Sequence, residues 1–214
     1  MRTLGTILTL ILIPAVAGSA RAAVEIETFA GSAWNLKVPV RISQEGSAEL
    51  NFTGRFDTRA FDLPLYYAWR VAWTEADCGW ALDFVHHKLY LEDRPPEVQR
   101  FSISHGFNIL SVARFWNRGW GRLYIGLGII LAHAENEVRG RALDETGGIA
   151  GGGYYLTGPA ATLGLGKRVF RCGRFHLAGE LRGTAARARI PVVEGTARFN
   201  HFGLHAVSGV GFRL

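Results

Sequence analysis

The sequence lacks a long hydrophobic run outside its first 22 residues. A helix that crosses a bilayer needs about 20 consecutive apolar residues, and no later stretch approaches that length. The apolar run that starts at Leu4 is shorter and leads into Ala20-Arg21-Ala22, which has the small-residue pattern of a cleavage site. We therefore expect residues 1–22 to be a cleaved signal peptide and residues 23–214 to form one exported domain without spanning helices.

Cysteine is also scarce, since Cys78 and Cys172 are the two in the chain. In an oxidising compartment they could pair. The topology expected below places them in two turns at the same end of a barrel but on opposite walls. A disulfide needs Cα atoms within about 7 Å, so we expect the two thiols to stay apart.

The excess of positive charge is small. Removal of Arg2 and Arg21 with the signal peptide leaves 22 basic residues against 18 acidic ones, and the formal charge falls from +6 to about +4. For an exported protein, such an excess suggests a lipid surface rather than nucleic acid as the anionic partner. A solvated surface with no preferred partner fits the charge equally well.

What the sequence does contain is alternation. Segments of about 10 residues with alternating hydrophobicity, separated by turn residues, are typical of a transmembrane β-barrel. Eight such segments are joined by links that are alternately short and long, as periplasmic turns and external loops are. The expected strands are about 24–33, 59–74, 79–92, 101–116, 122–138, 154–170, 174–188 and 197–214, and the expected long links are 34–58, 93–100, 139–153 and 189–196. Beside the short links lie Trp73, Trp80, Trp116 and Trp120, as expected for an inner aromatic girdle.

A soluble β-sandwich or lipocalin-like barrel has the same period of hydrophobicity. The residue composition of the two faces of each strand must therefore distinguish these folds from a membrane barrel. Between Leu123 and Leu131 one face carries branched aliphatic residues and the other carries Tyr124, Gly126, Gly128 and Ile130. Such a strand suits lipid on the outside and a narrow, crowded lumen on the inside. The chain also ends with Val210, Phe212 and Leu214 on one face, which resembles the C-terminal signal of bacterial outer-membrane barrels.

Charges on the opposite face support the same interpretation. Four of them interrupt apolar alternations, and in a lumen this narrow they would pair with one another. They are Arg70, Asp83, Glu180 and Arg182. We therefore predict an all-β, eight-stranded, antiparallel up-and-down transmembrane β-barrel in the bacterial outer membrane.

Toward the external end of three neighbouring strands, the outward face becomes polar. Parity places His86 and Lys88 outward on one strand, Asn108 on the next, and His133 and Glu135 on the third. The patch would lie roughly 20 Å from the inner girdle along the membrane normal, at the level of the outer headgroups. The alternative is that these side chains are polar only because this end of each strand is exposed to water. A β-bulge near Val85 would instead turn His86 into the lumen.

Two further kinds of chemistry are conceivable at this end of the barrel, nucleophilic catalysis by a serine–histidine pair and metal binding. Ser104 and His105 are adjacent, so in a regular strand they point to opposite faces and cannot form a nucleophilic pair. His86, His133 and Glu135 make a two-histidine, one-carboxylate set that could hold a divalent metal. No ligand spacing demands a metal, so we assign no metal ligand.

Several short segments resemble successive segments of OmpA-like eight-stranded barrels, and in particular the lipid A oxidase-like outer-membrane proteins. The segments are Phe61–Tyr67, Leu82–Tyr90, His105–Leu110, Tyr124–Gly128, Thr157–Ala160 and Ala178–Arg182. The resemblance spans nearly all of the expected mature chain. The chain departs from the pattern at His87, where an aromatic residue is usual, and at Leu214, where these barrels usually end in Phe.

This resemblance implies oxidation of the proximal glucosamine of lipid A to an aminogluconate unit, with molecular oxygen as co-substrate. It implies catalytic roles for His86 or His133 as a base and for Glu135 as the group that orients it. Lys88 and Asn108 would bind lipid A. A divalent metal is compatible with this chemistry but is not required by the sequence.

The sequence leaves open whether the protein is an enzyme. The alternative is a non-catalytic OmpA-like barrel for envelope integrity or for surface adhesion through loops 34–58 and 139–153. A small pore is disfavoured because the interior of eight strands is filled by side chains. We expect a monomer whose partners are outer-membrane lipids, including lipid A and lipopolysaccharide, and not nucleic acid.

Overall fold

The computed structural model describes residues 23–214, so the expected signal peptide lies outside the described part of the chain. The described strands are β1 (Ala23–Asn35), β2 (Val38–Gln44), β3 (Leu50–Gly54), β4 (Phe56–Asp57), β5 (Tyr67–Glu75), β6 (Cys78–Leu91), β7 (Val98–Arg118), β8 (Gly121–His133), β9 (Glu135–Val138), β10 (Arg141–Ala142), β11 (Tyr154–Cys172), β12 (Phe175–Val192) and β13 (Gly195–Arg213). Among these residues there is no helix that is long and apolar enough to span a bilayer. Cys78 and Cys172 are both free thiols, as expected.

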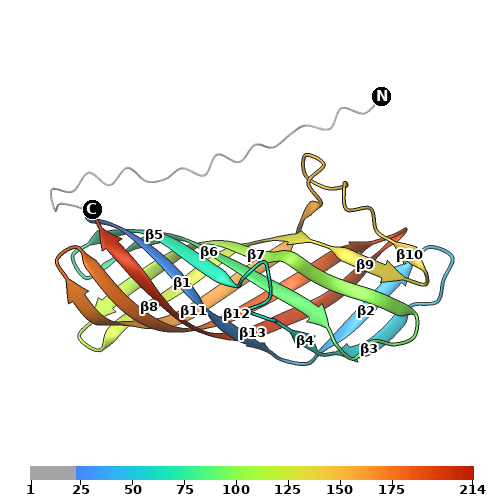
Figure 1. The fold of residues 1–214 in the computed structure, drawn as a ribbon, viewed down its shortest axis with the longest axis horizontal. Coiled ribbons are helices and arrows are strands. Elements are labelled where there is room, and N and C mark those ends of the chain that lie inside the picture. Colours follow the sequence, from blue (N-terminus) through green and yellow to red (C-terminus); the bar gives the residue numbers. More distant parts are fainter. Residues whose placement is uncertain (1–22) are drawn as a thin grey trace.

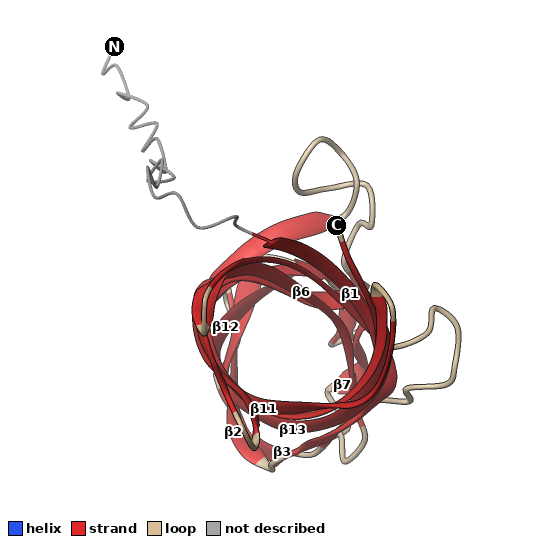
Figure 2. Ribbon diagram, turned by 90° about the vertical axis from the view of Figure 1, so that its left-hand side faces the viewer, coloured by secondary structure: helices blue, strands red, loops and turns tan. Residues whose placement is uncertain are grey.

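Eight of the strands form one closed ring. In order around the ring they are β1, β5, β6, β7, β8, β11, β12 and β13, each antiparallel to the next, and β13 pairs back onto β1. The view along the axis shows the closed wall (Figure 2). Because every strand has a partner on both sides, the barrel has no open edge of unpaired backbone groups. The predicted eight-stranded antiparallel barrel is confirmed.

The second strand is shorter than expected. We predicted a strand from 59 to 74, but β5 begins at Tyr67 and residues 58–66 form a loop with a cis peptide bond before Pro64. Proline cannot donate to a β-ladder, so this stretch leaves the sheet even though its apolar residues alternate.

The external end is more regular than expected. The expected loop 34–58 contains β2, which continues along β13 beyond β1, and β3, which folds back on β2. The expected long link 189–196 is a two-residue turn between Val192 and Gly195. These segments are polar on their outer face because they lie in water beyond the bilayer. The alternation of apolar and polar residues is therefore lost before the strands stop pairing.

Several strands are therefore much longer than a membrane requires. About 9–11 residues suffice to cross a bilayer, whereas β7 has 21 residues and β13 has 19. The extra length, with β2, β3, β9 and β10, lies at the end opposite the C-terminus (Figure 1). Inside this extension apolar side chains fill the lumen, among them the buried Val40, Ile42, Phe101, Phe199 and Ile190.

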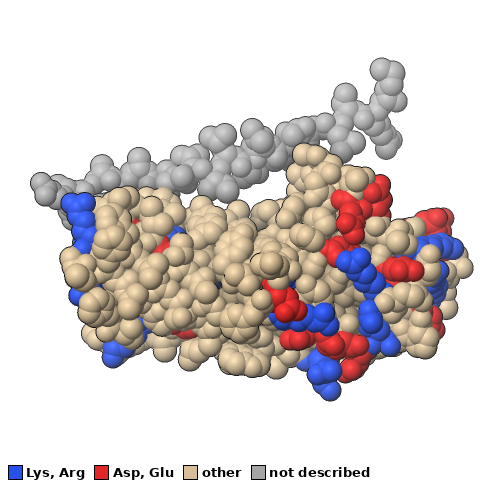
Figure 3. Space-filling view, viewed as in Figure 1, with Lys and Arg blue, Asp and Glu red and all other residues tan. Residues whose placement is uncertain are grey.

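An apolar belt surrounds the middle of the barrel. Its exposed side chains come from all eight strands of the ring, namely Ile26, Trp73, Trp80, Val112, Leu127, Leu163, Leu181 and Leu204. On the face in Figure 3, charged side chains gather at the end with the long loops, and a few lie at the opposite end, with largely uncharged surface between them. Trp73, Trp80 and Trp120 are exposed near the short turns. An apolar band bordered by aromatic residues is the surface of a barrel that spans an outer membrane.

Candidate functional site

Four charged side chains meet inside the barrel. Arg70 lies 3.2 Å from Asp83 (Nε to Oδ1) and 2.8 Å from Glu180 (Nη1 to Oε2). Arg182 lies 3.3 Å from Asp83 (Nη1 to Oδ2) and 2.6 Å from Glu180 (Nη2 to Oε1). All four side chains are buried. The residues singled out in the sequence as a lumen charge network are thus in direct contact with one another.

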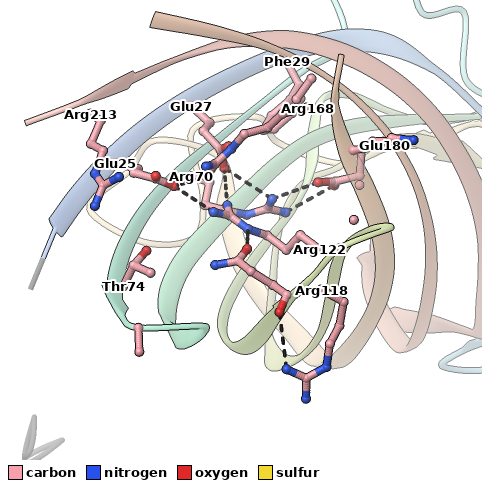
Figure 4. Close-up of a pocket in the computed structure, with 17 residues that line it drawn as sticks. Glu25, Glu27, Phe29, Arg70, Thr74, Arg118, Arg122, Arg168, Glu180 and Arg213 are labelled. Carbon is pink, nitrogen blue, oxygen red and sulfur yellow. Dashed lines mark hydrogen bonds and ion pairs between the residues drawn. The ribbon is translucent and has the colours of Figure 1, made fainter. Parts of the chain in front are cut away.

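This network continues toward the short-turn end, where it lines a cavity of about 340 Å³ (Figure 4). Arg122 pairs with Glu25 at 2.7 Å and with Glu27 at 3.0 Å. Arg168 reaches Glu25 at 2.5 Å from a partly exposed position. Each of these arginines faces a carboxylate, so its charge is compensated by a partner inside the barrel.

The outward wall carries a second polar cluster, at the external edge of the apolar belt. His86 lies opposite Asn108 in the pairing of β6 with β7, and its Nδ1 donates to the Asn108 Oδ1 at 2.7 Å. The His86 ring stacks on Tyr67 with centroids 4.8 Å apart. His87 has the opposite parity and is buried inside the barrel, 3.1 Å from the Thr58 hydroxyl (Nε2 to Oγ1).

A bulge in β7 creates the centre of this cluster. His87 pairs with Phe107 but Leu89 pairs with Ile103, so β7 has two more residues than β6 between these pairs. Gly106 adopts a φ of +123°, which L-residues rarely tolerate. The bulge therefore lies on β7 and not near Val85 on β6, so His86 still faces outward.

The bulge overturns the expectation that Ser104 and His105 point apart. Their Oγ and Nδ1 atoms are 3.1 Å apart, and both side chains contact the same carboxylate, that of Glu135. The His105 Nδ1 donates to the Glu135 Oε1 at 2.6 Å, and the Ser104 hydroxyl donates to the same oxygen. Glu135 thus supplies an acid beside the serine and the histidine. An isolated glycine within a strand was the available signal, because it often marks a bulge.

These three residues do not form a serine-protease-like triad. In such a triad the two ring nitrogens of the histidine bridge the hydroxyl and the acid. Here Ser104 and Glu135 both contact the Nδ1 of His105. The imidazole cannot relay a proton between them in that way, so the arrangement is a carboxylate–imidazole cluster rather than an activated serine.

His133 completes the cluster from β8. Its Nδ1 lies 3.9 Å from the Glu135 Oε1, and its ring centroid is 5.0 Å from that of His105. Tyr154 packs edge-on against His133 and donates its hydroxyl to the His105 carbonyl at 3.0 Å. Arg100 pairs with the other carboxylate oxygen of Glu135. The sequence assigned no role to Arg100, Ser104, His105 or Tyr154 in this cluster.

Lys88 occupies the outward face but is covered. Its Nζ donates to the Asp62 carbonyl at 2.6 Å, beneath loop 58–66, and the side chain is buried. The loop exposes Phe61 and Leu63, which are 80% and 84% exposed. An apolar loop thus overhangs the polar cluster at the membrane's outer edge.

Between this loop and β7 lies a pocket of about 490 Å³. Its lining includes Arg59, Arg94, Arg100, His105 and Glu135. The hydrogen bond from Arg59 to Glu92, at 2.9 Å, raises the pKa of the Arg59 guanidinium. Three arginines against the carboxylates of Glu92 and Glu135 leave an excess of one positive charge in the lining, next to the carboxylate–imidazole cluster. This combination suits an anionic, hydroxyl-bearing ligand.

Comparisons with known proteins concern the barrel only. No protein-family model matches the chain, and no curated protein matches it by sequence. Among solved structures, it is similar to the Neisserial surface protein A (11% identity, 90% of this chain and 97% of that one, TM-score 0.41). It is also similar to the outer membrane protein AlkL (12% identity, 94% of both chains, TM-score 0.45). A third likeness is to Ail of Yersinia pestis, solved with the heparin analogue sucrose octasulfate (12% identity, 90% of this chain and 99% of that one, TM-score 0.41). None of these likenesses assigns a ligand or an activity to this chain.

Proposed function

We propose that the protein acts on lipid A in the outer leaflet and oxidises its proximal glucosamine. The observation that carries the proposal is the position of the Glu135 cluster. It lies on the outer wall of the barrel, where the apolar belt ends, and not in the lumen or in a distant loop. A ligand that reaches it from the membrane must be an amphiphile with a polar, hydroxyl-bearing headgroup.

The surroundings fit lipid A in two respects. Its acyl chains can lie along the apolar wall of β8, where Leu127 and Ile129 are exposed, and beneath the Phe61 and Leu63 side chains of the overhanging loop. Its phosphates can bind the guanidinium groups that line the pocket, because planar guanidinium groups form paired hydrogen bonds with phosphate oxygens. The wall and the pocket meet at the cluster, so chain and headgroup can be bound at once.

The reaction requires a base beside the sugar. Oxidation of the C1 hemiacetal to a lactone removes two electrons and two protons, which molecular oxygen takes up to give hydrogen peroxide, and hydrolysis of the lactone gives the aminogluconate. His86 and His133 each have a buried ring nitrogen without a hydrogen-bond partner among the described residues. The His86 Nε2 can accept the proton of the C1 hydroxyl, as can the His133 Nδ1 when no metal ion is bound to it. Glu135 is held by His105 and Arg100, which fixes the acid next to the base.

Lipid A mass spectra from a deletion strain provide the cellular test. Deletion should remove an oxidised lipid A species, and the intact gene should restore it. Glu135→Gln should fail to restore it, whereas Glu137→Gln, in the same strand but outside the cluster, should succeed. A lipid A profile that does not change upon deletion would contradict the proposal.

A second candidate is a non-catalytic barrel that supports envelope integrity or surface adhesion. It is favoured by the long charged extension beyond the membrane, which is built from β2, β3 and the outer ends of β12 and β13 (Figure 3). This candidate predicts unaltered lipid A together with detergent sensitivity or loss of surface binding in the deletion strain.

A further inference from the structure

We propose that His105, His133 and Glu135 form a divalent metal site on the outer wall of the barrel. One ring nitrogen from each histidine and one carboxylate oxygen lie within 4.8 Å of one another. The three ligands come from separate elements, the β7 bulge, the end of β8 and the start of β9. The barrel register therefore brings them together, and no sequence motif does. This site stands independently of any reaction on lipid A.

The separations suit a bound transition metal. Metal–nitrogen and metal–oxygen bonds of about 2.0–2.2 Å place ligand atoms roughly 3–3.5 Å apart around one ion. The His105 Nδ1 and the His133 Nδ1 lie 2.6 Å and 3.9 Å from the Glu135 Oε1. Small side-chain rotations thus bring all three to bonding distance. Two imidazoles and one carboxylate favour Zn²⁺ or Fe²⁺ over Mg²⁺ and Ca²⁺, which prefer oxygen ligands.

His133 supplies an independent observation. Its Nδ1 is buried and has no hydrogen-bond partner among the described residues, although buried polar atoms are nearly always paired. The other ring nitrogen, Nε2, is closely approached by Gly153, where a Cβ atom would lie only 2.4 Å away. The backbone thus fixes the ring with its Nδ1 toward Glu135, and a metal ion would provide the missing partner.

The neighbours of the three ligands have the roles expected of a second coordination shell. Arg100 binds the Oε2 of Glu135 and leaves the Oε1 on the side of the histidines. The Tyr154 hydroxyl binds the carbonyl of His105 and its ring packs on His133. Such outer contacts hold ligands in position and raise metal affinity.

The open side of the site faces the pocket. The His105 side chain is 58% exposed, and His105 and Glu135 both line the pocket of about 490 Å³. Three protein ligands with free positions toward a pocket are typical of catalytic rather than structural metal sites. His86 is not part of this set, since its ring nitrogens are not among the ligand atoms that lie within 4.8 Å of one another. The ligand set therefore differs from the His86, His133 and Glu135 combination considered from the sequence.

The test is metal binding by the refolded full barrel, made without a histidine tag and freed of metal. Titration with Co²⁺ should produce visible d–d absorption that saturates at one ion per barrel, and excess Zn²⁺ should abolish it. His105→Ala, His133→Ala and Glu135→Gln should each weaken binding by about 10–100-fold or more. Glu137→Gln, in the same strand as Glu135 but outside the cluster, is the matched control and should bind as the unaltered barrel does.

Folding of each variant is checked by its heat-dependent migration on SDS gels, and His133→Asn replaces any alanine variant that does not fold. A folded unaltered barrel that gives no Co²⁺ absorption would overturn the proposal. Undiminished binding by folded His105→Ala and His133→Ala would do so too. Loss of binding in His86→Ala with retention in His105→Ala would reject this ligand set in favour of another. Because the probe is the metal alone, failure of lipid A oxidation does not affect the result.

Discussion

Glu180 shows how single residues hold the lumen together. Its two oxygens contact Arg70 and Arg182, and Tyr124 donates its hydroxyl to the same carboxylate. All these side chains are buried, so none can exchange its partner for bulk water. Loss of the carboxylate would leave two buried guanidinium groups to share the single carboxylate of Asp83, with Glu27 as a further partner of Arg70 only.

Glu180→Gln should therefore destabilise the barrel. Removal of one partner from a buried ion pair costs about 3–5 kcal/mol, and urea unfolding in lipid vesicles should show a loss of this size. Glu194→Gln removes the partner of Arg141 on the surface and should leave the unfolding curve unchanged. Equal stability of the two variants would show that the lumen charges do not support the fold.

At this scale the sequence predicted contacts that follow from strict parity. Arg70 and Asp83 interrupt regular alternation, so their inward direction and their pairing could be inferred. His105 could not be placed, because the β7 bulge inserts two extra residues between Ile103 and Phe107, and alternation fails for the residues inside it although Ile103 and Phe107 both face the lumen. The central histidine of the site was therefore dismissed on a rule that holds only for unbroken strands.

At the scale of elements, the β7 bulge is the feature on which the site depends. It turns His105 toward Glu135 while Asn108 remains bonded to His86. Gly106 makes this possible, because its φ of +123° disfavours any side chain. A Cβ atom there would also lie 2.3 Å from the Asn108 Oδ1.

Gly106→Ala should thus distort the bulge and the site together. A strained backbone position costs about 1–3 kcal/mol, so the variant should fold with a loss of stability of this order and bind Co²⁺ more weakly. Gly119→Ala, in the turn between β7 and β8, has no atom within 4 Å of the added Cβ and serves as the control. Full stability and full metal binding in Gly106→Ala would contradict the role given to the bulge.

Loop 58–66 shows why one element was assigned incorrectly. Phe61, Leu63 and Leu65 alternate with polar residues as a strand would, yet they are exposed on a loop that covers Lys88. Alternating hydrophobicity indicates only that one side of a segment faces an apolar environment. A loop at the membrane edge can have such a side without pairing with any strand. Pro64 was the contrary signal.

For the whole molecule, the apolar belt determines where the barrel sits. Leu127 is 71% exposed in the middle of the aliphatic face of β8, and Leu123 lies near Trp120 at the short-turn end. The cost of a charge on this surface depends on depth, from about 2–4 kcal/mol at the midplane to about 0–1 kcal/mol near the interfaces. The belt can therefore be mapped by its tolerance of arginine.

Leu127→Arg should destabilise the barrel in vesicles by about 2–4 kcal/mol, and Leu123→Arg by no more than about 1 kcal/mol. Unfolding by denaturant in phospholipid vesicles measures both. Similar values for the two variants would place the belt outside the bilayer.

The architecture as a whole followed from the sequence because period, face composition and link length all depend on the membrane. The part beyond the membrane did not follow in the same way. There both faces of β2, β12 and β13 meet polar surroundings or a packed lumen, so the outer face no longer distinguishes strand from loop. The cluster around Glu135 lies at the boundary of these two regions. Parity therefore placed His133 and Glu135 on one outer face but set Ser104 and His105 apart.

We propose that the cluster around Glu135 oxidises lipid A from the outer wall of the barrel. The most direct measurement is the mass of lipid A after incubation with the purified barrel in phosphatidylcholine vesicles. The lipid A carries a free C1 hydroxyl, and divalent metal and air are supplied. The account predicts loss of two hydrogens from the proximal sugar, or the hydrolysed aminogluconate form, with formation of hydrogen peroxide. Argon and Glu135→Gln should each prevent this change. Unaltered lipid A with the folded, metal-supplied barrel under air, or equal oxidation by Glu135→Gln, would contradict the account.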